Sequence, residues 1–176
     1  MNNKKIIFGI AIAFIISLNI YNIPFKEKEV SAAPSIDEIR DEKSISIHQL
    51  NEAINKGLDK KYNLMNYENI IVTFWATWCP SCRRENTVFN SFHKKNKEVL
   101  IIGVCVDKDP NALAEYKKES PLHFPTFNTT KDIAILFDDI LAVPTHFIID
   151  VKRQTVNKTM GLLDENQLKH LLGVKK

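Results

Sequence analysis

The sequence has few cysteines, and this scarcity excludes several classes of protein. Three cysteines among 176 residues are too few for the disulfide framework of a small secreted scaffold, which carries a denser, even-numbered set. A structural zinc site normally takes four ligands, and no second pair accompanies Cys79 and Cys82. Arg83 follows the pair, so the Cys-x-x-Cys-His haem-attachment pattern is absent. The remaining interpretation of the pair is a reactive dithiol.

An excess of charge of one sign is lacking as well. The chain has 24 Lys and Arg against 21 Asp and Glu, a net charge of +3. These charges are interspersed rather than gathered into one stripe, and we therefore expect no binding to nucleic acid. The composition has no signature of disorder or of repeats. The length corresponds to about one domain with appendages.

The cysteine pair stands where a predicted strand meets a predicted helix. The apolar run 70–76 is typical of a buried strand, and a helix is expected from Pro80 to about Lys97. A thiol at a helix N-terminus faces unpaired backbone N–H groups and the positive end of the helix dipole. Both favour the thiolate, which is the form that attacks disulfides. The context therefore indicates a redox role for the pair.

The N-terminus reads as a targeting segment. Lys4 and Lys5 precede a nearly unbroken apolar stretch up to residue 25, which at about 1.5 Å per residue can cross a hydrocarbon core about 30 Å thick. We predict a signal-anchor over residues 1–25 and a polar linker over 26–43. A signal peptide cleaved after the small residues 31–33 is the alternative. Either interpretation exports the remaining chain, and the anchor attaches it to the membrane.

The rest of the chain alternates predicted strands with predicted helices, over a domain of residues 44–173. This order is typical of an α/β protein with a mostly parallel central sheet covered on both sides. The last two strands break the alternation and indicate an antiparallel edge. Besides 70–76, strands are predicted at 44–48, 99–106, 124–127, 145–150 and 155–160; besides 80–97, helices are predicted at 49–61, 109–119 (with Asp109 as N-cap and Pro110 in the first turn), 133–137 and 164–172.

Two motifs carry a family resemblance: FWATWCPSCR at residues 74–83 and VPTHFIID at residues 143–150. Together they resemble thioredoxin-like proteins, and more narrowly the membrane-anchored TlpA/ResA/DsbE-type thiol–disulfide oxidoreductases of bacteria. The resemblance covers about residues 44–172. It implies a thioredoxin-like fold, a central mixed β-sheet flanked by helices, preceded here by the N-terminal membrane-anchor helix.

The resemblance also implies roles for matching residues. Cys79 corresponds to the exposed attacking cysteine and Cys82 to the buried resolving cysteine, which together form the redox disulfide. Pro144 corresponds to the cis-proline that packs against the pair. Val143 would offer its backbone to an extended substrate in the manner of strand addition, beside Trp78 and the Pro80–Ser81 turn.

Some residues depart from the pattern of thioredoxins. Thr73 stands where thioredoxins carry a buried Asp that helps to move the proton of the second cysteine. Glu85 matches an acidic residue near the active site of the ResA-like group and would take over that role; the alternative is a solvated carboxylate on the helix surface. Ser81 could offer its hydroxyl to Cys79, or be a tolerated surface residue. Cys105 is interpreted as a small buried hydrophobic residue, and His146 as a packing or surface residue.

The predicted function is that of a disulfide reductase on the extracytoplasmic, periplasmic or outer side of the cell membrane. The resemblance implies that its protein substrates are apocytochrome c, in cytochrome c biogenesis, or other exported proteins with cysteine pairs. A membrane electron-transfer partner would re-reduce it. An oxidase or isomerase of secreted proteins is the alternative within the same chemistry. A soft-metal module with Cys79 and Cys82 as ligands is a further alternative, but no Met- or His-rich cluster lies beside the pair, and we expect neither metal nor cofactor.

Overall fold

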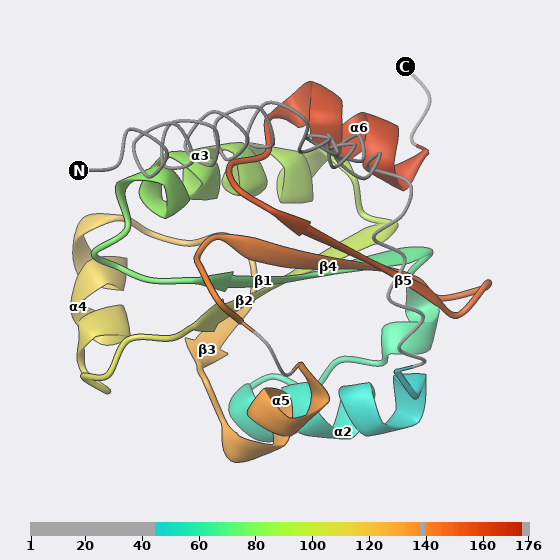
Figure 1. The fold of residues 1–176 in the computed structure, drawn as a ribbon, viewed down its shortest axis with the longest axis horizontal. Coiled ribbons are helices and arrows are strands. Elements are labelled where there is room, and N and C mark those ends of the chain that lie inside the picture. Colours follow the sequence, from blue (N-terminus) through green and yellow to red (C-terminus); the bar gives the residue numbers. More distant parts are fainter. Residues whose placement is uncertain (1–44, 138–139, 174–176) are drawn as a thin grey trace, which may run out of the picture. The chain divides into compact units, whose positions relative to one another are not determined.

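The computed structural model describes residues 45–137 and 140–173, which form a central β-sheet with helices on both faces (Figure 1). The predicted anchor (1–25) and linker (26–43) lie outside the described residues. Within the described ranges, no helix is long and apolar enough to cross a membrane.

The sheet is mixed, as predicted. Its order is β3-β2-β1-β4-β5. The first three strands are mutually parallel, whereas β4 runs antiparallel to β1 and β5 antiparallel to β4. The central strand β1 is buried on both faces, which explains its continuous apolar run. The strands span Asn69–Trp75 (β1), Val99–Cys105 (β2), Thr126–Asn128 (β3), Thr145–Asp150 (β4) and Thr155–Met160 (β5).

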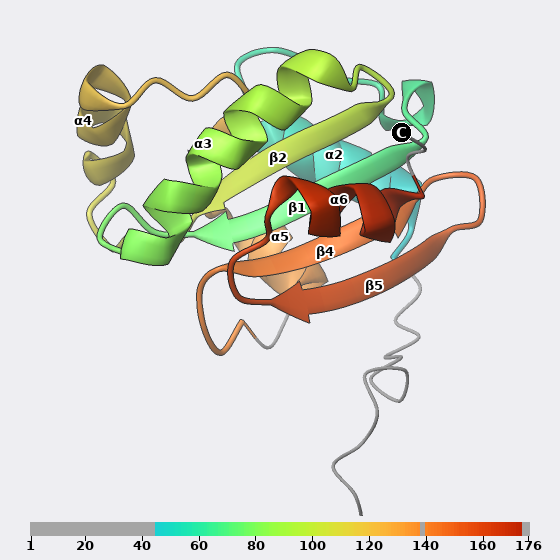
Figure 2. The ribbon, with the colours of Figure 1, turned by 90° about the horizontal axis from the view of Figure 1, so that it is seen from above.

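Helices cover both faces of the sheet. Helices α3 (Pro80–Lys95) and α6 (Glu165–Leu172) lie side by side on one face, and α2 (Ile47–Gly57) and α5 (Lys131–Leu136) lie on the other (Figures 1 and 2). Helix α4 (Ala112–Glu119) packs near the start of α3, and a short 3-10 helix, η2, spans Leu64–Asn66.

Alternate residues of β1 enter different layers of the core. Ile70, Val72 and Phe74 pack toward α2 and α5, and Ile71 packs toward α3 and α6. Each such fully buried side chain contributes about 1.5–3 kcal/mol through burial. The alternation places Thr73 on the α3 face, where the functional site lies.

Two predicted elements were wrong. Residues 44–48 were predicted as a strand, but helix α2 begins at Ile47, and its buried Leu50, Ala53 and Ile54 follow a helical spacing that overrides the short alternation. Asp109 is not the N-cap of α4. Its side chain accepts a hydrogen bond from Asn111 N at 2.9 Å and forms a turn that delays the helix to Ala112. The strands predicted at 145–150 and 155–160 are present with those bounds, and the other predicted elements are present with shifted ends.

Candidate active site

The cysteine pair lies at the N-terminus of α3, directly after β1. Cys79 is the N-cap residue, and its sulfur accepts the backbone N–H of Cys82 at 3.2 Å. Pro80 occupies the first helical position, where the missing N–H costs no helical hydrogen bond. The two cysteines form a disulfide with a Cα–Cα distance of 5.3 Å. The predicted redox pair is therefore present in its oxidised form.

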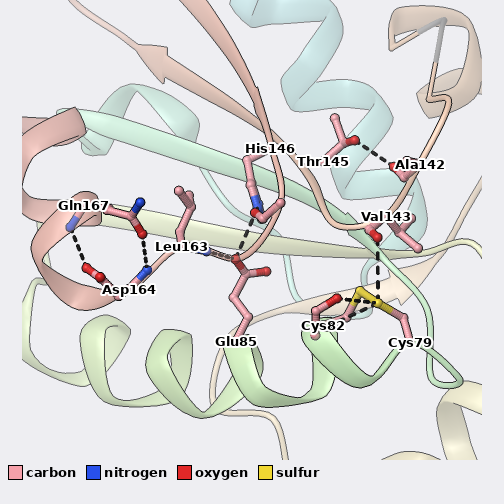
Figure 3. A network of polar contacts seen from close by, with 12 residues as sticks. Cys79, Cys82, Glu85, Ala142, Val143, Thr145, His146, Leu163, Asp164 and Gln167 are labelled. Carbon is pink, nitrogen blue, oxygen red and sulfur yellow. Dashed lines mark hydrogen bonds and ion pairs between the residues drawn. A yellow bond between two sulfur atoms is a disulfide. The ribbon is translucent and has the colours of Figure 1, made fainter.

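Three groups surround the sulfur of Cys79 (Figure 3). The Ser81 hydroxyl lies 3.2 Å away and acts as the donor, because a disulfide sulfur carries no hydrogen. The Val143 carbonyl oxygen lies 3.8 Å away, and the Val143–Pro144 peptide bond is cis. This cover leaves Cys79 only 4% exposed, less than the resemblance implies, while Cys82 is fully buried as expected. The structure therefore brings Cys79, Cys82, Ser81 and the cis-proline segment together.

Tryptophan and arginine side chains surround the pair. Trp75 is fully buried and packs edge-on against Tyr116 of α4, with ring centroids 5.1 Å apart, whereas Trp78 is 68% exposed at the rim. Arg83 is exposed, and its guanidinium lies 5.8 Å from the centre of the Tyr116 ring. Arg84 is exposed beside it. The rim of the site is therefore aromatic and basic.

A carboxylate that the sequence did not single out holds the turn before Cys79. Asp107 Oδ2 accepts the backbone N–H of Thr77 and the thiol of Cys105, both at 2.9 Å. Cys105 is buried as predicted, and burial raises the pKa of its thiol to about 12. The position of Asp107, shortly after an apolar strand, is the only sequence signal for this role.

Glu85 lies inside the protein, one turn after Cys82 along α3. Its side chain is 1% exposed, so the alternative of a solvated carboxylate is wrong. Oε1 accepts the backbone N–H of Leu163 at 2.6 Å and lies 3.2 Å from Nε2 of His146 (Figure 3). His146 on β4 is fully buried and packs edge-on against Phe89. Of the packing and surface roles left open for His146, the structure shows the packing one, but its contact with Glu85 was not foreseen.

Thr73 completes this buried polar layer. It pairs with His146 across β1 and β4 and is fully buried. Its hydroxyl has no hydrogen-bond partner among the described residues, and neither does Nδ1 of His146. Beside Thr73, which stands where the resemblance places a buried Asp, lies His146, whose Nε2 contacts Glu85. No group of three or more His, Cys, Asp or Glu side chains within the described ranges could hold a metal ion.

A Cys-x-x-Cys disulfide at a helix start, beside a cis-proline on a mixed sheet, defines a class: the thioredoxin-like thiol–disulfide oxidoreductases. The chain belongs to the AhpC/TSA family, whose profile matches residues 48–158. It is similar to thiol-disulfide oxidoreductase ResA of Bacillus subtilis, with 26% identity over 175 residues, covering 96% of this chain and 92% of the relative. ResA of Bacillus thuringiensis subsp. konkukian is 28% identical over 117 residues, covering 64% and 68%. The chain is thus a ResA-like thiol–disulfide oxidoreductase.

Solved structures confirm the fold. StoA from Bacillus subtilis superposes with a TM-score of 0.55 at 23% identity, covering 64% of this chain and 88% of that one. A secreted Mycobacterium tuberculosis disulfide oxidoreductase homologous to Escherichia coli DsbE gives 0.55 at 15% identity, covering 71% and 99%. At these identities the likeness concerns the fold alone.

Proposed function

We propose that this chain is an exported, membrane-tethered oxidoreductase that reduces disulfides in extracytoplasmic proteins such as apocytochrome c. The single observation that supports it most is the Cys79–Cys82 disulfide at the start of α3, facing the cis-proline segment. Export and tethering rest on Lys4, Lys5 and the apolar stretch that follows them.

The first step of the proposed cycle is an attack by Cys79. In the reduced protein its thiolate is favoured by the N-terminus of α3, by the N–H of Cys82 and by the Ser81 hydroxyl. The thiolate bonds to one sulfur of the substrate disulfide, and the other substrate sulfur leaves as a thiolate that takes a proton from solvent. The product is a mixed disulfide on Cys79.

The second step releases the substrate. Cys82 gives its proton to the carboxylate of Glu85, one turn further along α3, and attacks the sulfur of Cys79. The bond between Cys79 and the substrate breaks, and the second substrate sulfur leaves as a thiolate that is then protonated. The enzyme is left as the disulfide, and a membrane electron-transfer partner supplies two electrons and two protons to restore the thiols.

Substrate binding is assigned to the rim of the site. The Val143 carbonyl lies beside the Cys79 sulfur, where an extended substrate chain can pair with the backbone before Pro144. Trp78 is largely exposed next to Cys79 and offers apolar contact area, while Pro80 and Ser81 form the adjacent edge. These contacts suit unfolded chains with exposed cysteine pairs.

The function is tested with a variant that stops the cycle after its first step. Cys82→Ala is expected to hold substrates on Cys79 as mixed disulfides, which are recovered from cells and identified by mass spectrometry. Cys79→Ala is the matched control and should trap nothing. Recovery of c-type apocytochromes supports the reductase proposal. Recovery of diverse secreted proteins without cytochromes would contradict it and favour an oxidase or isomerase.

A further inference from the structure

Glu85 and His146 form an ion-pairing contact that is closed to solvent. Their side chains are 1% and 0% exposed, and the distance from Glu85 Oε1 to His146 Nε2 is 3.2 Å. A carboxylate taken out of water without partners is strongly disfavoured in its charged form. Two groups offset that cost here, the N–H of Leu163 at 2.6 Å and the imidazole of His146. The imidazole is the only one of the two that can itself carry a positive charge.

The surroundings of the ring determine its tautomer. Nε2 lies 3.2 Å from Glu85 Oε1 and 3.0 Å from the carbonyl oxygen of Gly161. A carbonyl oxygen only accepts hydrogen bonds, so Nε2 carries the hydrogen and donates. Nδ1 has no partner in the described part of the chain. His146 therefore directs the N–H of Nε2 toward Glu85 Oε1 and the Gly161 carbonyl.

The same ring connects the buried carboxylate to the cis-proline segment. The Gly161 carbonyl faces Nε2 of His146, and the Gly161 N–H donates to the Pro144 carbonyl at 2.9 Å. Two residues later, Leu163 donates to Glu85. Through these hydrogen bonds, residues 161–163 connect Pro144 to helix α3, which carries Glu85 and Cys82.

Few titratable groups face this contact. From α3 they are Glu85 itself and Cys82, which lies on the same buried face of the helix. From β1 the facing residue is Thr73, which does not titrate, and from the turn before α6 the partners are backbone groups of Gly161 and Leu163. The ionisable side chain that His146 contacts directly is therefore Glu85, on the same buried face of α3 as Cys82.

We propose that His146 is a positioning residue for the second step of thiol exchange: it holds the Glu85 carboxylate ready to accept the proton of Cys82. This inference rests on the proposed roles of Cys79, Cys82 and Glu85. In that step the S–H bond of Cys82 breaks and its proton passes to Glu85. The Cys82–Cys79 bond then forms as the bond from Cys79 to the substrate breaks.

The test follows both steps with dithiobis(nitrobenzoate) as the substrate disulfide. The reduced full-length protein should release the coloured thionitrobenzoate in two phases, the first from the attack of Cys79 and the second from the attack of Cys82. His146→Leu is expected to slow the second phase about ten- to a hundredfold, because Glu85 loses a donor to its negative charge. The first phase should stay within about twofold of wild type, since the N-terminus of α3 is unchanged.

The pH dependence and a conservative variant separate positioning from packing. In His146→Leu the second phase should need a higher pH to reach half its maximal rate, because Cys82 then loses its proton without assistance. His146→Gln places an amide N–H near the position of Nε2 and should restore much of the rate. His123→Leu, at an exposed histidine elsewhere, is the matched control and should leave both phases unchanged.

A double variant decides whether His146 acts through Glu85. When Glu85 is already replaced by Gln, adding His146→Leu should slow the second phase no further. Additive losses, or a second phase of wild-type rate in His146→Leu, would overturn the inference. A wild-type protein that lacked the two phases would instead refute the proposed function. Circular dichroism of each variant establishes that it is folded.

Discussion

At the scale of single residues, Cys105 shows how burial governs a thiol that takes no part in the exchange. Its S–H donates to Asp107, and burial raises its pKa from 9.0 to about 12. A thiolate is the reactive form of cysteine, so Cys105 stays protonated and inert at neutral pH. The Asp107 carboxylate also holds the turn before Cys79 through Thr77.

This shift makes the stability of the protein depend on pH in the alkaline range. The folded state keeps the Cys105 proton more tightly than the unfolded state does. The contribution of this protonated thiol to the free energy of unfolding is therefore complete below about pH 9.0 and is lost as the pH rises toward about 12. In the oxidised protein Cys105 is the one free thiol among the three cysteines. We expect urea unfolding to show a steeper alkaline loss of stability in the wild type than in Cys105→Ala. Equal slopes would contradict the assignment.

Residue patterns explain what the sequence could and could not predict of the site. The burial of Glu85 was predictable from the sequence, because it lies on one helical stripe of α3. The spacing along this stripe is three, four and three, through Cys82, Glu85, Phe89 and Phe92. The position of His146 was not predictable in this way, because β4 is buried on both faces and the pattern does not tell which face a residue takes. Its contact with Glu85 depends on strand register and on the turn before α6.

At the scale of elements, α6 matters to the site because its first turn begins beside Glu85. Asp164 caps the helix by accepting the N–H of Gln167 at 2.8 Å, and the Gln167 side chain accepts the N–H of Asp164 at 2.9 Å. This capping box fixes the chain just after Leu163, whose N–H bonds to Glu85. The cap and the buried carboxylate therefore share one turn.

Removal of this cap should weaken the fold locally. Asp164→Ala is expected to lower the free energy of unfolding by about 1 kcal/mol, because the N–H of Gln167 loses its acceptor. Urea denaturation measures this loss. Asn166→Ala, at an exposed position of the same helix, should be neutral or slightly stabilising, since Ala is the better helix former. A loss as large in Asn166→Ala would show that the effect does not come from the cap.

The predictions of secondary structure were wrong at two places where the local sequence fits two different structures. Residues 44–48 alternate polar and apolar types like a strand, but Ile47 also begins the helical stripe of Leu50 and Ile54, and burial of that stripe prevails. The Asp109-Pro110 pair fits both a helix start and a turn, and the Asp109 side chain bonds within the turn. Long apolar strands such as 70–76 and 99–106 were predicted well because a central sheet position permits no other pattern.

At the scale of the whole molecule, the direction of electron flow depends on the relative stability of the oxidised and the reduced folded protein. The same disulfide chemistry serves a reductase or an oxidase, and the reduction potential decides between them. As a reductase, this protein should equilibrate with a glutathione buffer at a value near about −270 mV, as thioredoxin does, and a value near about −120 mV would indicate an oxidase. Tryptophan fluorescence is a suitable readout, because Trp78 adjoins the pair and Trp75 packs in the same cluster. Cys79→Ala should show no such transition.

The central position of β1 has a consequence for how the protein is made. Cys79 and Cys82 follow β1 directly, but the strand that completes their site, β4, lies far downstream, beyond Cys105. During synthesis all three thiols therefore exist before β4 can pair, and Cys79 or Cys82 is then free to form a wrong disulfide with Cys105. Burial of Cys105 in the finished sheet removes the competing partner. In the folded protein, Cys79 and Cys82 are therefore left to form their disulfide with each other.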